Sequence, residues 1–268
     1  MVQISLSRLG VFTLLLSALS LWSDNGCAQV TPNGVPSITL LTGESRDDNG
    51  EVIPIRPENQ RILEFIEHSI GIHFDIRRLP IPRVIEGVKQ GDGLGYGISK
   101  TSERLKFLAY SESIFTDYVW LIVPDDSSIE TGSHAELKGK SIGIVRGIRY
   151  NDEIDGMRNV WFKVEEDPSQ ISSRLKKLMS GRMDAMLLNS RTRTAKELEN
   201  DLNLYMQDRN IHSDSTDRHG IRVISKPFLA DDVYFVSGLN TDKSILNKIN
   251  AAILKGRKSG DLPLLQKP

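Results

Sequence analysis

The sequence predicts an α/β protein made of two lobes with a cleft between them. Residues 84–99 and 174–190 follow one scheme, in which a short helix stops at a glycine and a short strand follows with polar side chains at its end. One such unit lies in each half of the chain. Strand-like runs at 118–123 and 233–237 lie where the chain would leave the first lobe and return to it. Polar groups at the strand ends of two α/β units predict a binding cleft between them.

The first half of the chain is expected to alternate strands and helices. A helix begins at Pro57 and carries an apolar stripe until Gly71 stops it, because proline suits the first helical position and glycine the left-handed end. A second, shorter helix is expected at residues 83–90. The expected strands of this half cover residues 38–42, 72–79 and 94–98.

Four glycines alternate along the approach to the strand at 94–98: Gly91, Gly93, Gly95 and Gly97. If this stretch is extended, the four lie on one face, which is then bare of side chains. A bare face would allow a ligand or another backbone to approach closely. The alternative is that these glycines form a loose loop that leads into the strand. The spacing does not match Gly-x-Gly-x-x-Gly, so no dinucleotide site is predicted.

The second half is expected to repeat the alternation of strands and helices. A polar loop at 206–220 separates its middle from a final pair of strands and a closing helix. The expected strands of this half cover residues 118–123, 141–145, 160–164, 182–188, 221–224 and 233–237. The expected helices cover residues 168–180, 192–202 and 244–258.

The N-terminus differs from the rest of the chain. Arg8 precedes an uncharged run at residues 9–22, and a polar patch then leads to the small residues Gly26, Cys27 and Ala28. This order is typical of a secretory signal peptide over residues 1–28, so we expect a periplasmic protein that begins near Gln29. A retained N-terminal anchor is the alternative, and the residues before Cys27 match a lipid-attachment signal poorly.

Composition excludes several classes of partner. The 34 basic and 35 acidic residues nearly cancel, so charge gives no argument for binding nucleic acid or a membrane surface. Apolar residues make up 39% of the chain, which is enough for a core in one large domain or two small ones. We expect a monomer that binds a small molecule.

The most informative motif follows the strand at 94–98. Ser99, Thr101 and Arg104 come just after its carboxyl end, where open α/β sheets bind ligands. The planar guanidinium of arginine can grip a carboxylate through two parallel hydrogen bonds. A solvated arginine in a first helical turn is the alternative for Arg104.

This motif resembles the extracellular solute-binding proteins of family 3, which serve ABC transporters for polar amino acids. Residues 103–115, 136–147, 175–185 and 259–265 match the family's order and spacing from about Ile38 to the C-terminus. The resemblance implies a type II periplasmic-binding-protein fold with a two-strand hinge. The implied first lobe covers 29–115 and 234–268, the second lobe 120–228, and the hinge 116–119 and 229–233.

The resemblance also implies a binding site. In amino-acid-binding members, residues at the places of Ser99 and Arg104 hold the ligand carboxylate, and an acid at the place of Asn189 holds the α-ammonium. Here Asn189 is neutral, Ile148 and Arg149 replace small hydroxyl residues, and 43–50 replaces an aromatic segment. The residues expected to bind the ligand are Ser99, Thr101, Arg104, Arg149, Asn189, Glu44 and Tyr150.

The charge of these residues predicts an anionic or neutral polar ligand held chiefly by Arg104. The free N–H groups expected after Gly147, at the start of a helix, would add a partial positive charge. A sensory module that signals to a partner is the alternative function. A dehydratase of cyclohexadienyl acids is a third, for which Glu44 is the only carboxylate the sequence suggests.

Other chemistry finds no support in the sequence. The five histidines do not make a metal spacing, the single cysteine leaves with the signal peptide, and Gly-x-Ser-x-Gly is absent. We therefore expect no metal, no cofactor and no catalysis. The acidic pairs Asp125-Asp126 and Asp231-Asp232 are expected to be surface charge.

Overall fold

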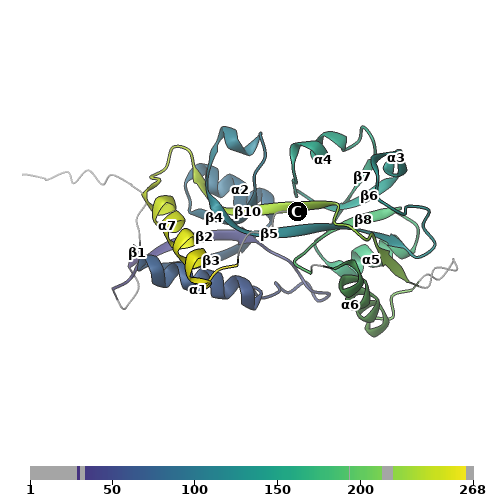
Figure 1. Cartoon of the computed structure of the whole chain (residues 1–268), viewed down its shortest axis with the longest axis horizontal. Helices are drawn as coiled ribbons and strands as arrows, with labels where there is room; N and C mark the ends of the chain where they lie inside the picture. Colours follow the sequence, from purple (N-terminus) through teal and green to yellow (C-terminus); the bar gives the residue numbers. More distant parts are fainter. Residues whose placement is uncertain (1–28, 31–33, 193, 213–219, 264–268) are drawn as a thin grey trace, which may run out of the picture.

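The structure is a computed structural model that describes residues 29–30, 34–192, 194–212 and 220–263 (Figure 1). The predicted signal peptide, with Cys27, lies outside these residues, and so does His219. Among the helices described, none has both the length and the apolar character needed to cross a bilayer.

Ten strands of the described chain are connected in one sheet. Its main path runs β1-β2-β4-β10-β5-β8-β6-β7, with β3 paired to β2 and β9 paired to β5. The strands are β1 (Gln29–Val30), β2 (Pro36–Gly43), β3 (His73–Leu79), β4 (Leu94–Ser99), β5 (Leu108–Pro124), β6 (Ser141–Val145), β7 (Lys163–Asp167), β8 (Ala185–Ser190), β9 (Ile221–Val223) and β10 (Leu229–Gly238).

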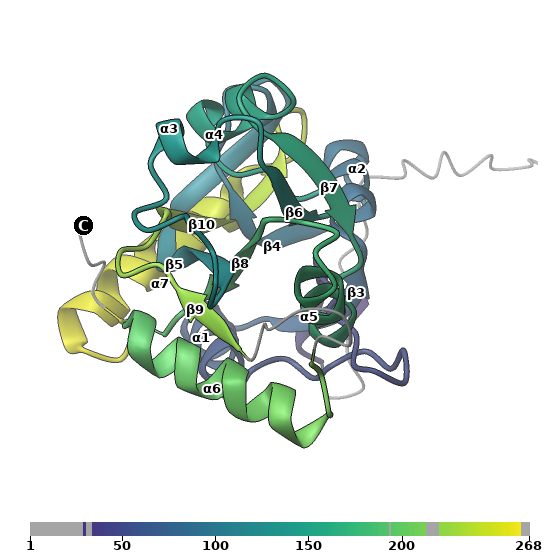
Figure 2. The ribbon, with the colours of Figure 1, turned by 90° about the vertical axis from the view of Figure 1, so that its right-hand side faces the viewer.

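Helices cover both faces of the sheet at each end of the molecule. Figure 1 shows α1, α2 and α7 around β2–β4, and α3–α6 around β6–β8; Figure 2 looks onto the second group from its end. The α-helices are α1 (Pro57–Ile70), α2 (Ile81–Gln90), α3 (His134–Leu137), α4 (Asp152–Met157), α5 (Ile171–Met179), α6 (Ala195–Asp208) and α7 (Ser244–Ser259). The 3₁₀ turn η1 covers Arg104–Lys106.

The buried apolar residues form separate cores at the two ends. One end packs α1 and α7 on one face of its strands and α2 on the other, around residues such as Phe74, Phe235 and Val88. The other end packs α3 and α4 on one face and α5 and α6 on the other, around residues such as Ile144 and Trp120. The molecule therefore has two α/β lobes, as the sequence predicts.

Two long antiparallel strands cross between the lobes. β5 pairs with β10 from Leu108–Gly238 to Val119–Leu229, and farther along it pairs with β8 and β9. The sequence analysis expected strand only from residue 118. The polar residues between Tyr110 and Ser113 hid the first half of β5, whose backbone pairs with β10 although its side chains are not a continuous apolar run.

The alternating glycines allow a close approach within the protein itself. A Cβ on Gly93 would lie 2.5 Å from the Thr39 carbonyl oxygen, and a Cβ on Gly95 would lie 2.6 Å from Val236 Cγ2. Atoms of the neighbouring strands β2 and β10 thus occupy the space beside Gly93 and Gly95. Gly91 and Gly97 have φ angles of 89° and 75°, so the four glycines do not form one extended face.

Candidate binding site between the lobes

Arg104 is buried at the edge of the first lobe that faces the second. Its backbone N–H donates to Thr101 Oγ1 at 3.2 Å, which fixes the turn η1 directly after β4. Its Nη1 donates to the Ser99 carbonyl oxygen at 3.1 Å, and the residue is only 6% exposed. The sequence therefore placed Ser99, Thr101 and Arg104 together correctly, and the alternative of a solvated Arg104 is wrong.

Most of the hydrogen-bonding capacity of the Arg104 guanidinium is not used by the described chain. Its bond to the Ser99 carbonyl is the single hydrogen bond that this group makes there, although arginine carries five N–H donors. Burial lowers the pKa of Arg104, while Tyr110 and the carboxylates Asp155 and Asp231 favour its charged form. Arginine remains charged under such conditions, so Arg104 is a mostly buried cation with spare donors, within electrostatic reach of Asp155 in the second lobe.

Asp231 lies beside this cation on β10. It is 9% exposed and accepts a hydrogen bond from Ser99 Oγ. Burial raises the pKa of Asp231 to about 6, helped by the like charge of Asp117 and opposed by Ser99 and Arg104. The expectation that the pair Asp231-Asp232 is surface charge is therefore wrong for Asp231.

A second arginine, Arg191, projects from the other lobe. It follows β8, and its guanidinium carbon lies 3.3 Å from the centre of the Phe115 ring. Its Nε lies 3.5 Å from Asp117 Oδ1, and its Nη2 donates to Asn59 Oδ1. Burial raises the pKa of Asp117, which Arg191 and Arg56 lower.

Arg191 forms part of the wall of a cavity of about 300 Å³ between the lobes. This cavity is lined by residues from β2, α1, β3, β4, β5 and β8, including Thr42, Arg78, Tyr96, Phe115, Asp117 and Asn189. Asn189 is thus at the cleft, as expected, and its Oδ1 accepts a hydrogen bond from the Tyr150 hydroxyl at 3.3 Å. Tyr150 itself is buried, and burial raises its pKa to about 12, so the hydroxyl stays protonated as a donor.

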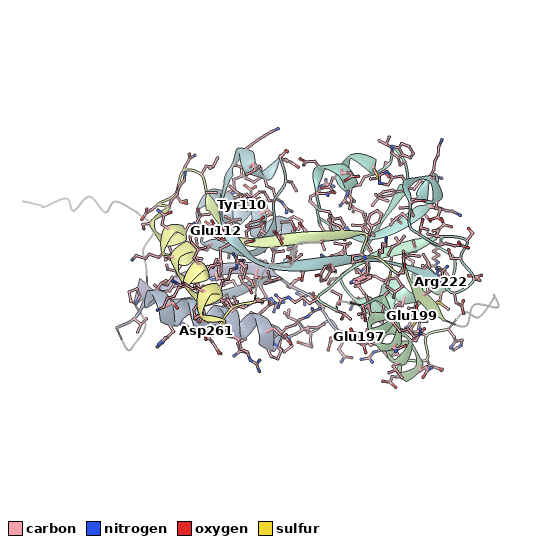
Figure 3. The ribbon with its side chains drawn as sticks, in the orientation of Figure 1. Tyr110, Glu112, Glu197, Glu199, Arg222 and Asp261 are labelled. Carbon is pink, nitrogen blue, oxygen red and sulfur yellow. The ribbon has the colours of Figure 1, made fainter. Side chains whose placement is uncertain are left out.

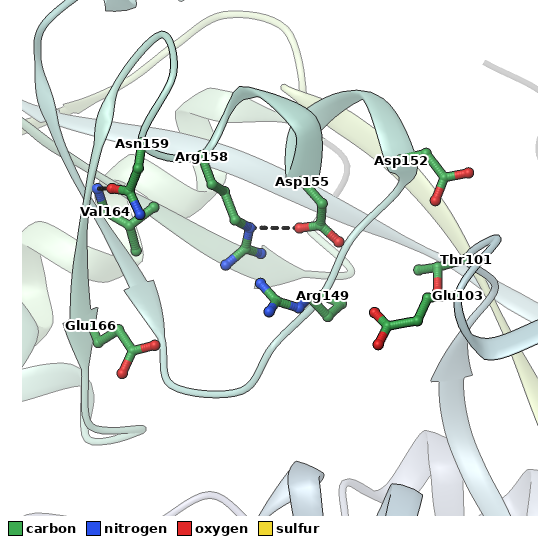
Figure 4. Close-up of a pocket in the computed structure, with 9 residues that line it drawn as sticks. All are labelled: Thr101, Glu103, Arg149, Asp152, Asp155, Arg158, Asn159, Val164 and Glu166. Atoms are coloured by element: carbon green, nitrogen blue, oxygen red, sulfur yellow. Dashed lines mark hydrogen bonds and ion pairs between the residues drawn. The ribbon is translucent and has the colours of Figure 1, made fainter.

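Arg149 lies in a separate, more acidic hollow of about 390 Å³ (Figure 4). Thr101 and Glu103 approach it from the first lobe, and α4 and β7 supply the rest. Four carboxylates line this hollow against two arginines, Arg149 and Arg158, and Arg158 is already paired with Asp155. The excess of negative charge opposes the anion site expected near Arg149.

The backbone after Gly147 does not offer the free N–H groups that the sequence suggested. The N–H of Tyr150 donates to Asp155 Oδ2 at 3.2 Å, and Asn151 Oδ1 caps Ile154 at 2.9 Å. Carboxylates also fill the first turn of α4. Two of the N–H groups at that helix start are therefore bonded within the protein, and the carboxylates of the first turn are unfavourable to an anion.

Glu44 lies apart from the cavities just described. Both of its carboxylate oxygens accept hydrogen bonds from Arg46, at 3.1 and 2.9 Å. Glu44 is therefore held by a neighbouring side chain of its own loop. Among the residues described, no group of three or more His, Cys, Asp or Glu side chains is placed to hold a metal ion.

The sequence analysis missed Asp117, Asp231 and Arg191. The sequence feature that could have indicated these residues is a charged side chain inside or next to an apolar strand in the region between the two halves. Charged side chains are also found on the outside of both lobes, where Figure 3 labels Glu112 on the first lobe and Glu199 and Arg222 on the second.

Comparisons with known proteins agree with this architecture. No family model and no curated protein matches the sequence. A variant of ArgBP from T. maritima matches with a TM-score of 0.61 and 18% identity, covering 84% of this chain and 90% of that chain. The GluR0 ligand-binding core from Nostoc punctiforme, in complex with (L)-glutamate, matches with a TM-score of 0.60 and 19% identity over 84% and 94%.

A third solved structure, the substrate binding protein of an amino acid ABC transporter, has a TM-score of 0.60 and 17% identity over 84% of this chain and 95% of that chain. At these identities the likeness defines the fold. The chain has the two-lobed α/β fold of type II periplasmic binding proteins.

Proposed function

We propose that this chain is a solute-binding protein that captures a small polar molecule bearing a carboxylate between its two lobes. The observation that carries the proposal is the buried Arg104 guanidinium, which makes one hydrogen bond within the described chain and faces the other lobe. A carboxylate would complete its planar set of donors through two parallel bonds. Two structural neighbours, one in complex with (L)-glutamate and one an ancestral arginine-binding protein bound to arginine, support this class of ligand.

The proposed mechanism is reversible closure about β5 and β10. We assign residues 29–115 and 234–268 to the first lobe, 120–228 to the second, and 116–119 and 229–233 to the hinge. Contacts already join the lobes, because the backbone N–H of Ser102 donates to Asp152 Oδ1 at 3.1 Å and Arg209 pairs with Asp48 at 2.6 Å. A ligand that touches both lobes would shift the equilibrium toward this closed form.

Export to the periplasm and delivery to an ABC transporter complete the proposal. The likeness to the substrate binding protein of an amino acid ABC transporter supports delivery, and the signal-like residues 1–28 support export. A sensory module is the second candidate, which the likeness to the GluR0 ligand-binding core favours. We do not propose a dehydratase, because the carboxylate that suggested this function, Glu44, is hydrogen-bonded to Arg46.

A melting screen tests the proposal directly. Amino acids, organic acids and small inorganic anions are added to the purified protein, because a ligand that binds only the folded state raises its melting temperature. We expect at least one carboxylate compound to raise it, and Arg104→Ala to abolish the rise. Stabilisation by a compound that is unchanged in Arg104→Ala would contradict the proposed site, and no stabilisation by any carboxylate would contradict the proposed function.

A further inference from the structure

The guanidinium of Arg191 has the surroundings of a bound ligand. An aromatic face, a carboxylate and an amide oxygen approach it from Phe115, Asp117 and Asn59. These are the groups that proteins use to bind a planar organic cation, because the ring face attracts positive charge and the oxygens accept its N–H groups.

None of these partners belongs to the lobe that carries Arg191. Asn59 lies on α1 and packs with the first lobe, Phe115 lies in the first-lobe core, and Asp117 lies on the crossing strand β5. Arg191 follows β8, whose strand partners are β5 and β6. Asp117 is also the neighbour of Arg191 across the antiparallel pairing of β5 with β8, next to the Tyr118–Ser190 pair. The bond to Asn59 and the stack on Phe115 are therefore the contacts that join the second lobe to the first.

The ion pair is sheltered as well as specific. The side chains of Arg191 and Asp117 are 22% and 25% exposed, and the cavity beside them is lined by Tyr96 and Asn189. A partly desolvated charge pair that also stacks on a ring is worth more than an exposed surface pair. It therefore holds the Arg191 guanidinium in place where it reaches Asn59 and Phe115 of the first lobe.

We propose that Arg191 is a tethered ligand, whose guanidinium fills a cation-binding subsite made by Asn59, Phe115 and Asp117 and so closes the protein without a bound molecule. Removing the side chain empties a subsite that accepts a free guanidinium-type cation. This inference concerns a different arginine and a different ligand charge from the proposed carboxylate site, and it holds whichever molecule binds at Arg104.

The test uses methylguanidinium chloride at millimolar concentration as the probe, with the full mature chain. Small-angle scattering measures the radius of gyration, and the shift of melting temperature measures probe binding. Arg191→Ala is the main variant, and Arg191→Met, which keeps an unbranched apolar stem, serves if the alanine variant does not fold. Arg209→Ala is the matched control, because it removes the other arginine that reaches across the cleft, to Asp48, without emptying the subsite.

We expect Arg191→Ala or Arg191→Met to have a larger radius of gyration than the unmodified protein. The variant should bind the probe at least about tenfold more tightly, because a tethered group competes at an effective concentration of millimolar order. Probe binding should return the radius toward its original value, whereas Arg209→Ala should show no gain in probe affinity. Adding Asp117→Asn to the Arg191 variant should remove the gain.

Three results would overturn the inference. The first is an unchanged radius of gyration in a folded Arg191 variant. The second is probe binding by the unmodified protein as tight as by that variant. The third is no probe binding by a variant that has opened. None of these results bears on binding of a carboxylate at Arg104, which the melting screen tests separately.

Discussion

Two arginines face the cleft from opposite lobes, and their guanidinium groups differ in what they contact. Arg104 donates one hydrogen bond to the main chain, whereas Arg191 stacks on Phe115, pairs with Asp117 and bonds to Asn59. The first arginine is desolvated with spare donors, and the second has its partners supplied by the chain. The difference teaches that a cationic residue in a cleft marks a ligand site only when the protein leaves its donors unused.

The largest effect is expected for Arg104→Ala, which tests the role of Arg104 in this comparison. Truncating one member of a buried charged contact costs about 2–5 kcal/mol of binding free energy, so the ligand found in the melting screen should bind far more weakly. Arg104→Lys keeps the charge but loses the planar fork, so its affinity for the ligand should lie between those of the unmodified protein and Arg104→Ala. Titration calorimetry measures both variants. Equal binding by Arg104→Lys and the unmodified protein would show that charge alone matters there.

The next test concerns Asp231, the carboxylate beside Arg104. Its pKa is raised from 3.8 to about 6 by burial, so the folded protein binds this proton more tightly than the unfolded chain. The charged carboxylate therefore opposes folding, and this cost appears as pH rises from about 4 through 6. Asp231→Asn should raise the free energy of unfolding at pH 7.5 by on the order of 2 kcal/mol and leave it nearly unchanged at pH 4.

Chemical denaturation at the two pH values measures this difference. Asp232→Asn is the comparison variant on the same strand, because Asp232 accepts a hydrogen bond from Thr116 and its charge adds less to the raised pKa of Asp231 than burial does. Its effect on stability should therefore be smaller. A stability gain for Asp231→Asn that is equal at pH 4 and pH 7.5 would show that burial of a charge is not the cause. A loss at pH 7.5 would mean that Asp231 stabilises Arg104 more than its burial costs.

The smallest expected effect is that of Asn189→Asp. The new carboxylate would lie in the cavity that holds Arg191, beside the Tyr150 hydroxyl. It should weaken binding of a purely anionic ligand by about tenfold, because an added like charge costs energy of order 1 kcal/mol across a partly solvated cleft. It should strengthen binding of a ligand that also carries an ammonium group. Calorimetry with an amino acid and the matching acid without its amine separates these cases.

Much of the fold could be predicted from local sequence patterns. Pro57 and Gly71 mark the ends of α1, and the repeated helix–glycine–strand units correspond to α2–β4 and α5–β8. The position of Arg104 followed from a polar cluster at a strand end. These features depend on residues close together in the chain, so periodicity and capping reveal them.

The partners within the cleft could not be predicted in the same way. Asp117 and Asp231 stand opposite each other only because β5 and β10 pair in that register. Arg191 and Asn59 are far apart in sequence, and nothing local to either residue indicates the contact. The expected anion site after Gly147 failed for the same reason, because Asp155 from the following helix takes the Tyr150 N–H.

The pairing of β5 with β10 also bears on how such a chain could be built or cut. Thr116 and Asp232 are direct partners across the two strands, and Thr116 Oγ1 donates to Asp232 Oδ1 at 2.6 Å. The points at which the chain departs toward the second lobe and comes back are therefore neighbours. A short turn could join them, so the intervening segment is in effect a large insertion into a hairpin. The first lobe closed by that turn is a candidate for folding as a protein of its own.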